Sequence, residues 1–283
     1  MAYVRTIANG TNLPLAATSP HLGHLGWDTQ FLPFAIREGH EVITRDAIPP
    51  DRTIRFTVGG APRSRTLSAD DIRIIIRGNQ DADIQYLRRA RSLVIPAIIS
   101  RAARAAVMAN ATRYAIASFS PGEQKHHALR RTHGQSQADA RGDVVSDLRS
   151  QHAGILTETD WNKRLYRIGK AIHLIQDAFS PAHMERDLAS RGCIRRIRNY
   201  GGGSKLFDPG TPGPEHGVPT DHRDRVSNHP GLKIAAANAT RRYLQIVFKA
   251  IYGRDPRNPD AALAVREAAE ELNNFITDHF RPC

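Results

Sequence analysis

Cysteine is scarce in this chain, with only Cys193 and Cys283 among 283 residues. Two cysteines are too few for a disulfide framework or a thiolate zinc site, so we expect one disulfide or two free thiols. Long apolar runs are also missing, because arginines interrupt the most apolar stretch, Leu93–Ala117. A membrane span needs about 18 or more consecutive apolar residues, and the sequence therefore predicts none. The N-terminus lacks the charged-then-apolar pattern of a signal peptide, which argues against export by the general route.

Aromatic residues are few, at 6% of the chain, and basic residues outnumber acidic ones, which gives a formal net charge of +12. A positive surface favours polyanionic partners such as nucleic acid, anionic lipid or phosphorylated small molecules, although a merely solvated arginine-rich exterior has the same composition. No basic run is interleaved with aromatic residues as in a single-strand binding groove. The composition therefore does not support specific readout of a base sequence.

The hydrophobic pattern is typical of a helical protein. Helices are expected over Ser68–Arg77, Ile84–Ala117, Ala138–Ile155, Trp161–Phe179, Leu232–Tyr252 and Pro259–Phe280. Gly253 is expected to cap the end of the helix Leu232–Tyr252, and Asn258-Pro259 to begin the helix that runs to Phe280. The length suits one all-α domain over residues 1–283, in which residues 1–28 form a poorly structured N-terminal segment.

Two stretches depart from this helical pattern. Short extended segments at Thr53–Val58 and Ser64–Leu67, joined through Gly59-Gly60, predict a hairpin. The stretch Tyr200–Pro219 is rich in glycine and proline and predicts a loop. The chain has no glycine-rich phosphate loop and no Gly-x-Ser-x-Gly turn, so these motifs indicate neither a nucleotide site nor a serine nucleophile.

The segment from residue 165 to residue 183 is the most informative. Its apolar residues step by three and four, as on a core-facing helix: Leu165, Ile168, Ile172, Ile175 and Phe179. His173 and Asp177 lie one turn apart beside this stripe, where we expect them to be half-buried in the core. Pro181 ends the helix, so that the chain can bring His183 back toward them. Zinc accepts imidazole nitrogen and carboxylate oxygen, so the spacing predicts a metal site. A hydrogen-bonded His–Asp pair that closes a core helix is the alternative interpretation.

Upstream segments carry further potential ligands. His40 precedes a short apolar run, Asp81 and Asp83 stand at the expected junction of two helices, and His126 and His127 are adjacent. Each has an ordinary explanation when it is taken singly, because loop histidines are usually solvated and aspartates at a helix start usually cap it.

Taken in order, these segments resemble the zinc-dependent phospholipase C and S1/P1 nuclease superfamily, over roughly residues 40–183. The central element of that family is His-x3-Asp-x5-His, often with a proline two residues before the last histidine. His173, Asp177, Pro181 and His183 reproduce it position for position. The resemblance also matches the family's earlier ligands, in the same order, to His40, Asp83 and His127.

The remaining ligands of the family are matched less directly. The family uses the amino group and carbonyl of a mature N-terminal tryptophan, whereas this chain begins Met1-Ala2-Tyr3. That metal position is empty, filled by a side chain, or created by processing before Trp27. After the central motif the family shows His-x3-Glu or His-x3-Asp, and we assign this role to His222 and Asp224, with His216 and Asp221 as substitutes. The other histidines, His126, His133 and His229, are expected to be solvated or to support a ligand.

The resemblance implies an all-α fold with two or three zinc ions. The implied metal ligands are His40, Asp83, His127, His173, Asp177, His183, His222 and Asp224. Zinc-bound water would act as the nucleophile, with Asp177 as the bridge between two ions and Asp83 as the residue that orients or deprotonates the water.

The implied activity is phosphodiester hydrolysis by a phospholipase C that acts on glycerophospholipids. The low aromatic content favours this substrate over the single strands cut by an S1/P1-type nuclease, which is the alternative. A non-enzymatic helical protein that binds nucleic acid or another partner is a third interpretation. The expected partners are a phospholipid or another phosphodiester and, peripherally, an anionic membrane. Because a phospholipase must spare its own membrane, we expect secretion, or delivery by a dedicated secretion system as for a bacterial effector.

Overall fold

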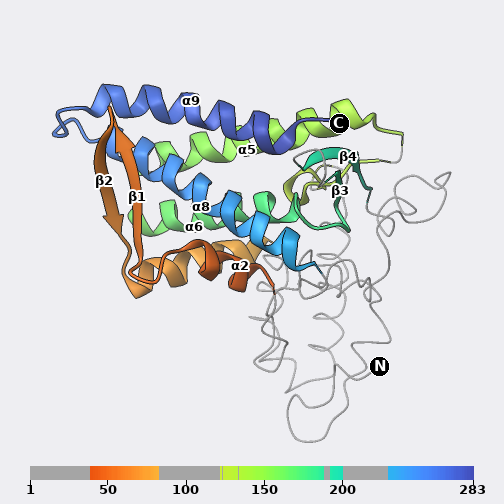
Figure 1. The fold of residues 1–283 in the computed structure, drawn as a ribbon, viewed down its shortest axis with the longest axis horizontal. Helices are drawn as coiled ribbons and strands as arrows, with labels where there is room; N and C mark the ends of the chain where they lie inside the picture. Colours follow the sequence, from red (N-terminus) through yellow and green to blue (C-terminus); the bar gives the residue numbers. More distant parts are fainter. Residues whose placement is uncertain (1–38, 83–121, 123, 133, 188–191, 200–228) are drawn as a thin grey trace, which may run out of the picture.

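The computed structural model describes residues 39–82, 122, 124–132, 134–187, 192–199 and 229–283. The expected helix over residues 84–117, the loop over 200–219 and the N-terminal segment 1–28 lie outside this part. The described part is mostly helical, in keeping with the expected all-α class, and adds two small antiparallel sheets (Figure 1). Among the described helices, none combines the length and apolar character that a membrane crossing requires.

Five of the described helices match those expected from the sequence, whereas the helix at residues 40–47 and the 3-10 helix at residues 124–127 were not expected. The described helices are α2 (His40–Ala47), a helix over residues 69–82, the short 3-10 helix η1 (Gln124–His127), α5 (Gln137–Thr157), α6 (Trp161–Asp177), α8 (Pro230–Gly253) and α9 (Ala261–Phe280). The long helices run alongside one another, with one sheet at each end of the bundle (Figure 1). All five apolar residues of the predicted α6 stripe are buried, which confirms that this face packs into the core.

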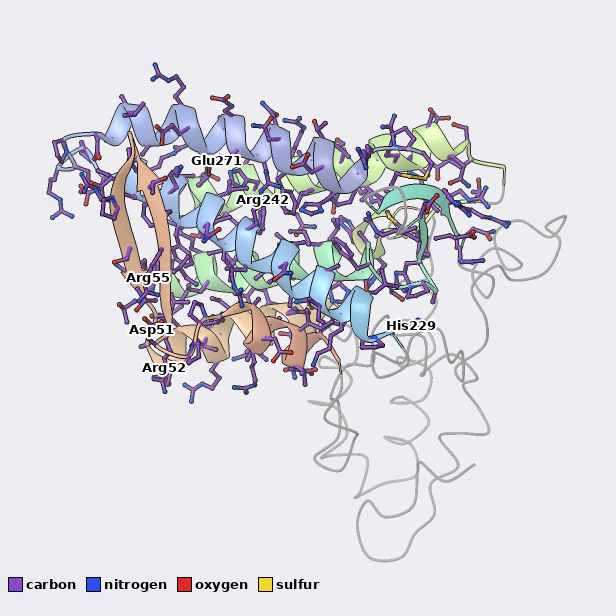
Figure 2. The ribbon with its side chains drawn as sticks, in the orientation of Figure 1. Asp51, Arg52, Arg55, His229, Arg242 and Glu271 are labelled. Carbon is purple, nitrogen blue, oxygen red and sulfur yellow. A yellow bond between two sulfur atoms is a disulfide. The ribbon has the colours of Figure 1, made fainter. Side chains whose placement is uncertain are left out.

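Helix α8 lies at the centre and contacts α9, α6, α2 and the hairpin. A helix with neighbours on several sides needs a wide apolar surface, and α8 buries Tyr243, Leu244, Val247 and Phe248 among others. The ammonium group of Lys249 is buried at the seam with α9, where Glu267 and Glu271 neutralise it. Arg242 and Glu271 lie along this seam in Figure 2, and Arg242 pairs with Asp278 of α9.

The turn between α8 and α9 corrects the expected capping. Gly253 does not adopt the left-handed conformation of a C-cap and belongs to the helix. Glycine is needed at this position for steric reasons, because a Cβ there would lie 2.8 Å from the carbonyl oxygen of Ala261. Helix α9 begins after Asp260 rather than at Pro259. The carboxylate of Asp260 binds the Tyr252 hydroxyl and Arg63, so it ties the turn to the hairpin instead of capping its own helix.

The predicted hairpin is confirmed, with strands β1 (Thr53–Val58) and β2 (Ala61–Thr66). Gly59 and Gly60 both have positive φ, 56° and 79°, as a tight two-residue turn with the twist of a hairpin requires. The second strand begins at Ala61 rather than at Ser64, so it includes Pro62. Proline has no N–H to donate, and β2 tolerates it because the sheet has two strands and β2 is an edge.

The second sheet was not expected from the sequence. Strands β3 (Met184–Asp187) and β4 (Cys193–Ile197) pair directly after the predicted metal motif. Of the two possibilities for the cysteines, the structure shows a disulfide, which ties Cys193 of β4 to Cys283, 90 residues further on. Arg186 reinforces this end of the bundle by donating to the carbonyl oxygens of Ala178 and His279 at the ends of α6 and α9. A cation is favourable there because helix C-termini carry partial negative charge.

Two glycines let α6 approach the helix over residues 69–82 at backbone contact. A Cβ on Gly78 would lie 2.0 Å from the carbonyl oxygen of Tyr166, and one on Gly169 would lie 2.1 Å from that of Ile75. The helix continues past the expected end at Arg77 to residue 82, so Asp81 lies within it rather than at a junction of two helices, and Asp83 lies outside the described residues. The close crossing is what brings Asn79 beside His173.

Candidate metal centre

The structure brings most of the predicted metal ligands to one point. The converging residues are His40 at the start of α2, His127 at the end of η1, His173 and Asp177 near the end of α6, and His183 just before β3. Asp83, His222 and Asp224 lie outside the described residues, as do His216 and Asp221.

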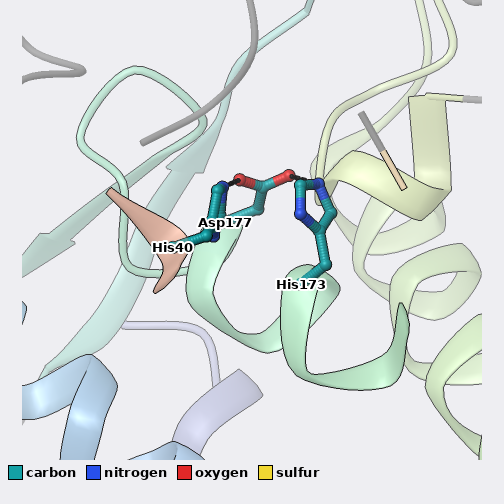
Figure 3. A group of neighbouring side chains, drawn as sticks. All are labelled: His40, His173 and Asp177. Carbon is teal, nitrogen blue, oxygen red and sulfur yellow. Dashed lines mark ion pairs between the residues drawn. The ribbon is translucent and has the colours of Figure 1, made fainter. Parts of the chain in front are cut away.

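The carboxylate of Asp177 occupies the centre of this cluster and is fully buried. Its Oδ1 lies 3.2 Å from Nε2 of His40, and its Oδ2 lies 3.0 Å from Nε2 of His173 (Figure 3). The same Oδ2 lies 3.3 Å from Nδ1 of His127 and 3.7 Å from Nδ1 of His183. One carboxylate is therefore shared between histidines on both of its sides. The sequence predicted His173 and Asp177 only partly buried beside the stripe, whereas both are completely buried.

Local geometry explains how the motif folds back on itself. Helix α6 ends at Asp177, whose carbonyl oxygen accepts from the amide of Ser180, and the Ser180 carbonyl in turn accepts from the amides of His183 and Met184. These turns reverse the chain after Pro181, as the proline predicted. The ring of His183 then reaches the backbone of η1, with Nδ1 2.5 Å from the carbonyl oxygen of His127.

Two buried polar atoms face each other in this cluster without a hydrogen bond. Within the described part of the chain, Nε2 of His40 and Oδ1 of Asp177 have no hydrogen-bond partner, although both are shielded from solvent. Burial by itself raises the pKa of Asp177, but the neighbouring His173, His183 and His127 hold that pKa well below its usual range. The side chain is therefore an anion at neutral pH, and a buried anion is favourable only beside positive charge.

A layer of buried amides and hydroxyls surrounds the cluster, and sequence reasoning missed it. Nδ1 of His40 lies 2.8 Å from Oε1 of Gln176, and Nδ1 of His173 lies 3.2 Å from Oδ1 of Asn79. The amide nitrogens of Asn79 and Gln176 both donate to the Thr44 hydroxyl. Gln176 directly precedes Asp177 and Asn79 directly follows Gly78, but neither the motif nor the helix pattern predicts what their side chains contact.

His126 pairs with a carboxylate outside the cluster. Nδ1 of His126 lies 2.8 Å from Oδ2 of Asp147. Burial by itself raises the pKa of Asp147, but hydrogen bonds from His126 and Gln151 outweigh it and leave the pKa below its ordinary value. His229 precedes the first residue of α8, and His133 lies outside the described residues.

The arrangement has the donor set of a metal centre. One ligand atom from each of His40, His173 and Asp177 lies within 4.8 Å of the others, and this group could hold a metal ion. Nitrogen and oxygen donors on buried, rigid elements suit a divalent transition-metal ion. Comparisons with family models, curated protein sequences and solved structures found no match for this chain.

Proposed function

We propose that this protein is a zinc-dependent phosphodiester hydrolase of the phospholipase C type. One observation carries the proposal: Oδ2 of Asp177, Nε2 of His173 and Nδ1 of His127 lie 3.0, 3.2 and 3.3 Å from one another. Ligand atoms about 2.0–2.1 Å from a tetrahedral zinc ion are separated by about 3.3 Å. The three atoms thus have the spacing of three corners of such a tetrahedron.

The second oxygen of Asp177 supports a further metal position. Its Oδ1 faces Nε2 of His40 at 3.2 Å, and both atoms lack a hydrogen-bond partner among the described residues. A carboxylate that offers one oxygen to each side suits a bridge between two cations, as the resemblance implies. The order of the converging residues along the chain is the order in the phospholipase C and S1/P1 nuclease superfamily, which also supports the proposal.

Bound zinc would supply a Lewis acid and a water that ionises near neutral pH. The role of Asp177, whose own side chain is fully buried, is to hold two positive charges close together. Asp83 is proposed to be a ligand that also orients or deprotonates the attacking water, and His222 and Asp224 are proposed to complete the ligand set. A glycerophospholipid is the proposed substrate, because the chain has 6% aromatic residues and a net charge of +12.

The presence of the metal is tested by elemental analysis of protein that has never been exposed to a chelator. We expect two or three zinc ions per chain, and a lower melting temperature after chelation, because metal binding is linked to folding. The non-enzymatic interpretation, in which the histidines are structural, predicts a metal-free protein whose melting is insensitive to chelators. That result would rule out the proposed function.

The substrate is tested by product identification. The zinc-loaded protein would be given vesicles of phosphatidylcholine, phosphatidylethanolamine or phosphatidylglycerol and, in parallel, single-stranded DNA and RNA. We expect diacylglycerol and a phosphorylated headgroup, formed faster on anionic vesicles at low salt than at high salt, since salt screens attraction between protein and membrane. Nucleoside monophosphates with intact lipid would instead establish the nuclease alternative. The salt effect cannot separate the two, because nucleic-acid binding is also salt-dependent.

A further inference from the structure

We infer that Asn79 and Gln176 are positioning residues that lock the rings of His173 and His40 in the tautomer that presents Nε2 to the metal. The inference rests on the proposed metal site and goes beyond it, because it assigns a role to residues that touch no metal. Both amides are completely buried, as are both histidines, so bulk water does not compete for these hydrogen bonds. Each ring meets its amide through Nδ1, at 3.2 Å from Asn79 and 2.8 Å from Gln176.

The tautomers follow from the orientation of the two amides. Nδ2 of Asn79 lies 3.1 Å from Oε1 of Gln176, so reversing only one amide would put two oxygens or two N–H groups in contact. Reversing both would turn two carbonyl oxygens toward the Thr44 hydroxyl, which has a single hydrogen to donate. In the orientation observed, both amide nitrogens donate to Thr44, and that of Gln176 also donates to the Thr240 hydroxyl of α8.

The amide oxygens therefore face the histidines, and each Nδ1 must carry the hydrogen. A neutral imidazole with Nδ1–H has a lone pair on Nε2, which is the atom that faces Asp177 in both His40 and His173. His183 follows the same rule, with the His127 carbonyl as its acceptor. His127 is the exception, because Nδ1 is the atom that it directs at Asp177. The network thus aims lone pairs and a carboxylate at the same points, an arrangement that a bound cation stabilises.

Nitrogen-15 NMR of the zinc-loaded wild-type protein reads these tautomers directly. We expect Nδ1–H signals from His40, His173 and His183, and an Nε2–H signal from His127. An Nε2–H signal from His40 or His173 would overturn the assignment, whatever the metal content. A wild-type protein that binds no zinc would overturn the proposed function, and its Nδ1–H signals would still decide whether the two amides set the tautomers.

Paired variants separate positioning from packing. Asn79→Asp keeps an oxygen for Nδ1–H of His173 but loses both amide donors, whereas Asn79→Leu keeps the volume and loses the acceptor. We expect Asn79→Leu to weaken zinc binding about 10- to 100-fold. Asn79→Asp should weaken it less, because it keeps the acceptor for His173, although it places a second oxygen opposite Oε1 of Gln176. Gln176→Glu and Gln176→Met make the same comparison at His40.

A matched control is Gln151→Leu, since the Gln151 amide donates to Asp147, outside the metal cluster. This variant should bind zinc like the wild type. Equal loss of zinc affinity in the aspartate and leucine variants of Asn79 would contradict the inference. If the amide only supported the fold, keeping the acceptor oxygen for His173 would make no difference.

Discussion

At the scale of single residues, Asp177 is a carboxylate that is buried at the centre of the candidate metal cluster. Its side chain has no exposure to solvent, and imidazole rings surround it on both sides. A buried carboxylate is costly unless positive charge compensates it, and this group of side chains could hold a metal ion. Under the proposed function, the carboxylate is the group that offers one oxygen to each of two ions.

Replacing Asp177 with asparagine tests this role. Asp177→Asn keeps the shape and removes the charge, so we expect zinc content to fall and hydrolysis to drop at least 100-fold, while the helical circular dichroism survives. Asp147→Asn is the matched control, because Asp147 is another buried carboxylate beside a histidine. It should retain zinc and activity. Equal damage from the two substitutions would show that the ligand assignment is wrong.

At the scale of elements, the crossing of α6 with the helix over residues 69–82 positions the site. Gly78 and Gly169 allow backbone contact between the two helices, and that contact places Asn79 beside His173. A side chain at the crossing would push the helices apart, and the metal cluster would open with them.

We therefore expect Gly169→Ala to destabilise the protein by about 1–3 kcal/mol or more, because its Cβ would lie 2.1 Å from the carbonyl oxygen of Ile75. Zinc affinity should fall as well. Gly142→Ala in α5 is the control, since a Cβ there meets nothing within 4 Å and alanine favours a helix by about 1 kcal/mol. Thermal melting and zinc titration of both variants measure the effect. Similar melting temperatures for the two would show that the crossing is not tight.

At the scale of the whole molecule, the helical bundle buries two histidines outside the candidate metal cluster. Burial lowers the pKa of His152 from 6.5 to about 4. Burial, together with the charges of Arg186 and Arg242, does the same for His279, from 6.5 to about 4. Both side chains therefore remain neutral in the folded protein at pH values where the unfolded chain binds a proton at each position.

The unfolded state binds more protons between pH 6.5 and 4, so stability should fall as the pH is lowered through that range. The loss should reach about 3 kcal/mol for each histidine and level off below pH 4. Urea unfolding of the wild type and of His152→Gln, across this range, measures the contribution of His152 as the difference in slope. Parallel slopes for His152→Gln and the wild type would contradict the prediction.

The sequence by itself determined the features that depend on neighbours along the chain. The α6 stripe follows from helical periodicity, the spacing of His173 and Asp177 from the helical repeat, and the first hairpin from two glycines that accept positive φ. The order of ligands also indicated that His40 and His127 would join the motif. Each of these features is predicted either from residues close together in the sequence or from the order of the candidate ligands along the chain.

Only the tertiary structure decided how the cluster is assembled. His40 and Gln176 are 136 residues apart, and their contact depends on how α2, α6 and α8 pack. The close approach at Gly78, the role of Gly253 and the strands β3 and β4 likewise depend on distant partners, including the disulfide to Cys283. The sequence pattern does not predict the contacts of side chains such as Asn79, because their hydrogen-bond partners lie on other elements of the fold. Tertiary packing also decides that Oδ1 of Asp177 faces His40 while Oδ2 faces His173, because α2 and α6 are far apart in sequence and adjacent in space.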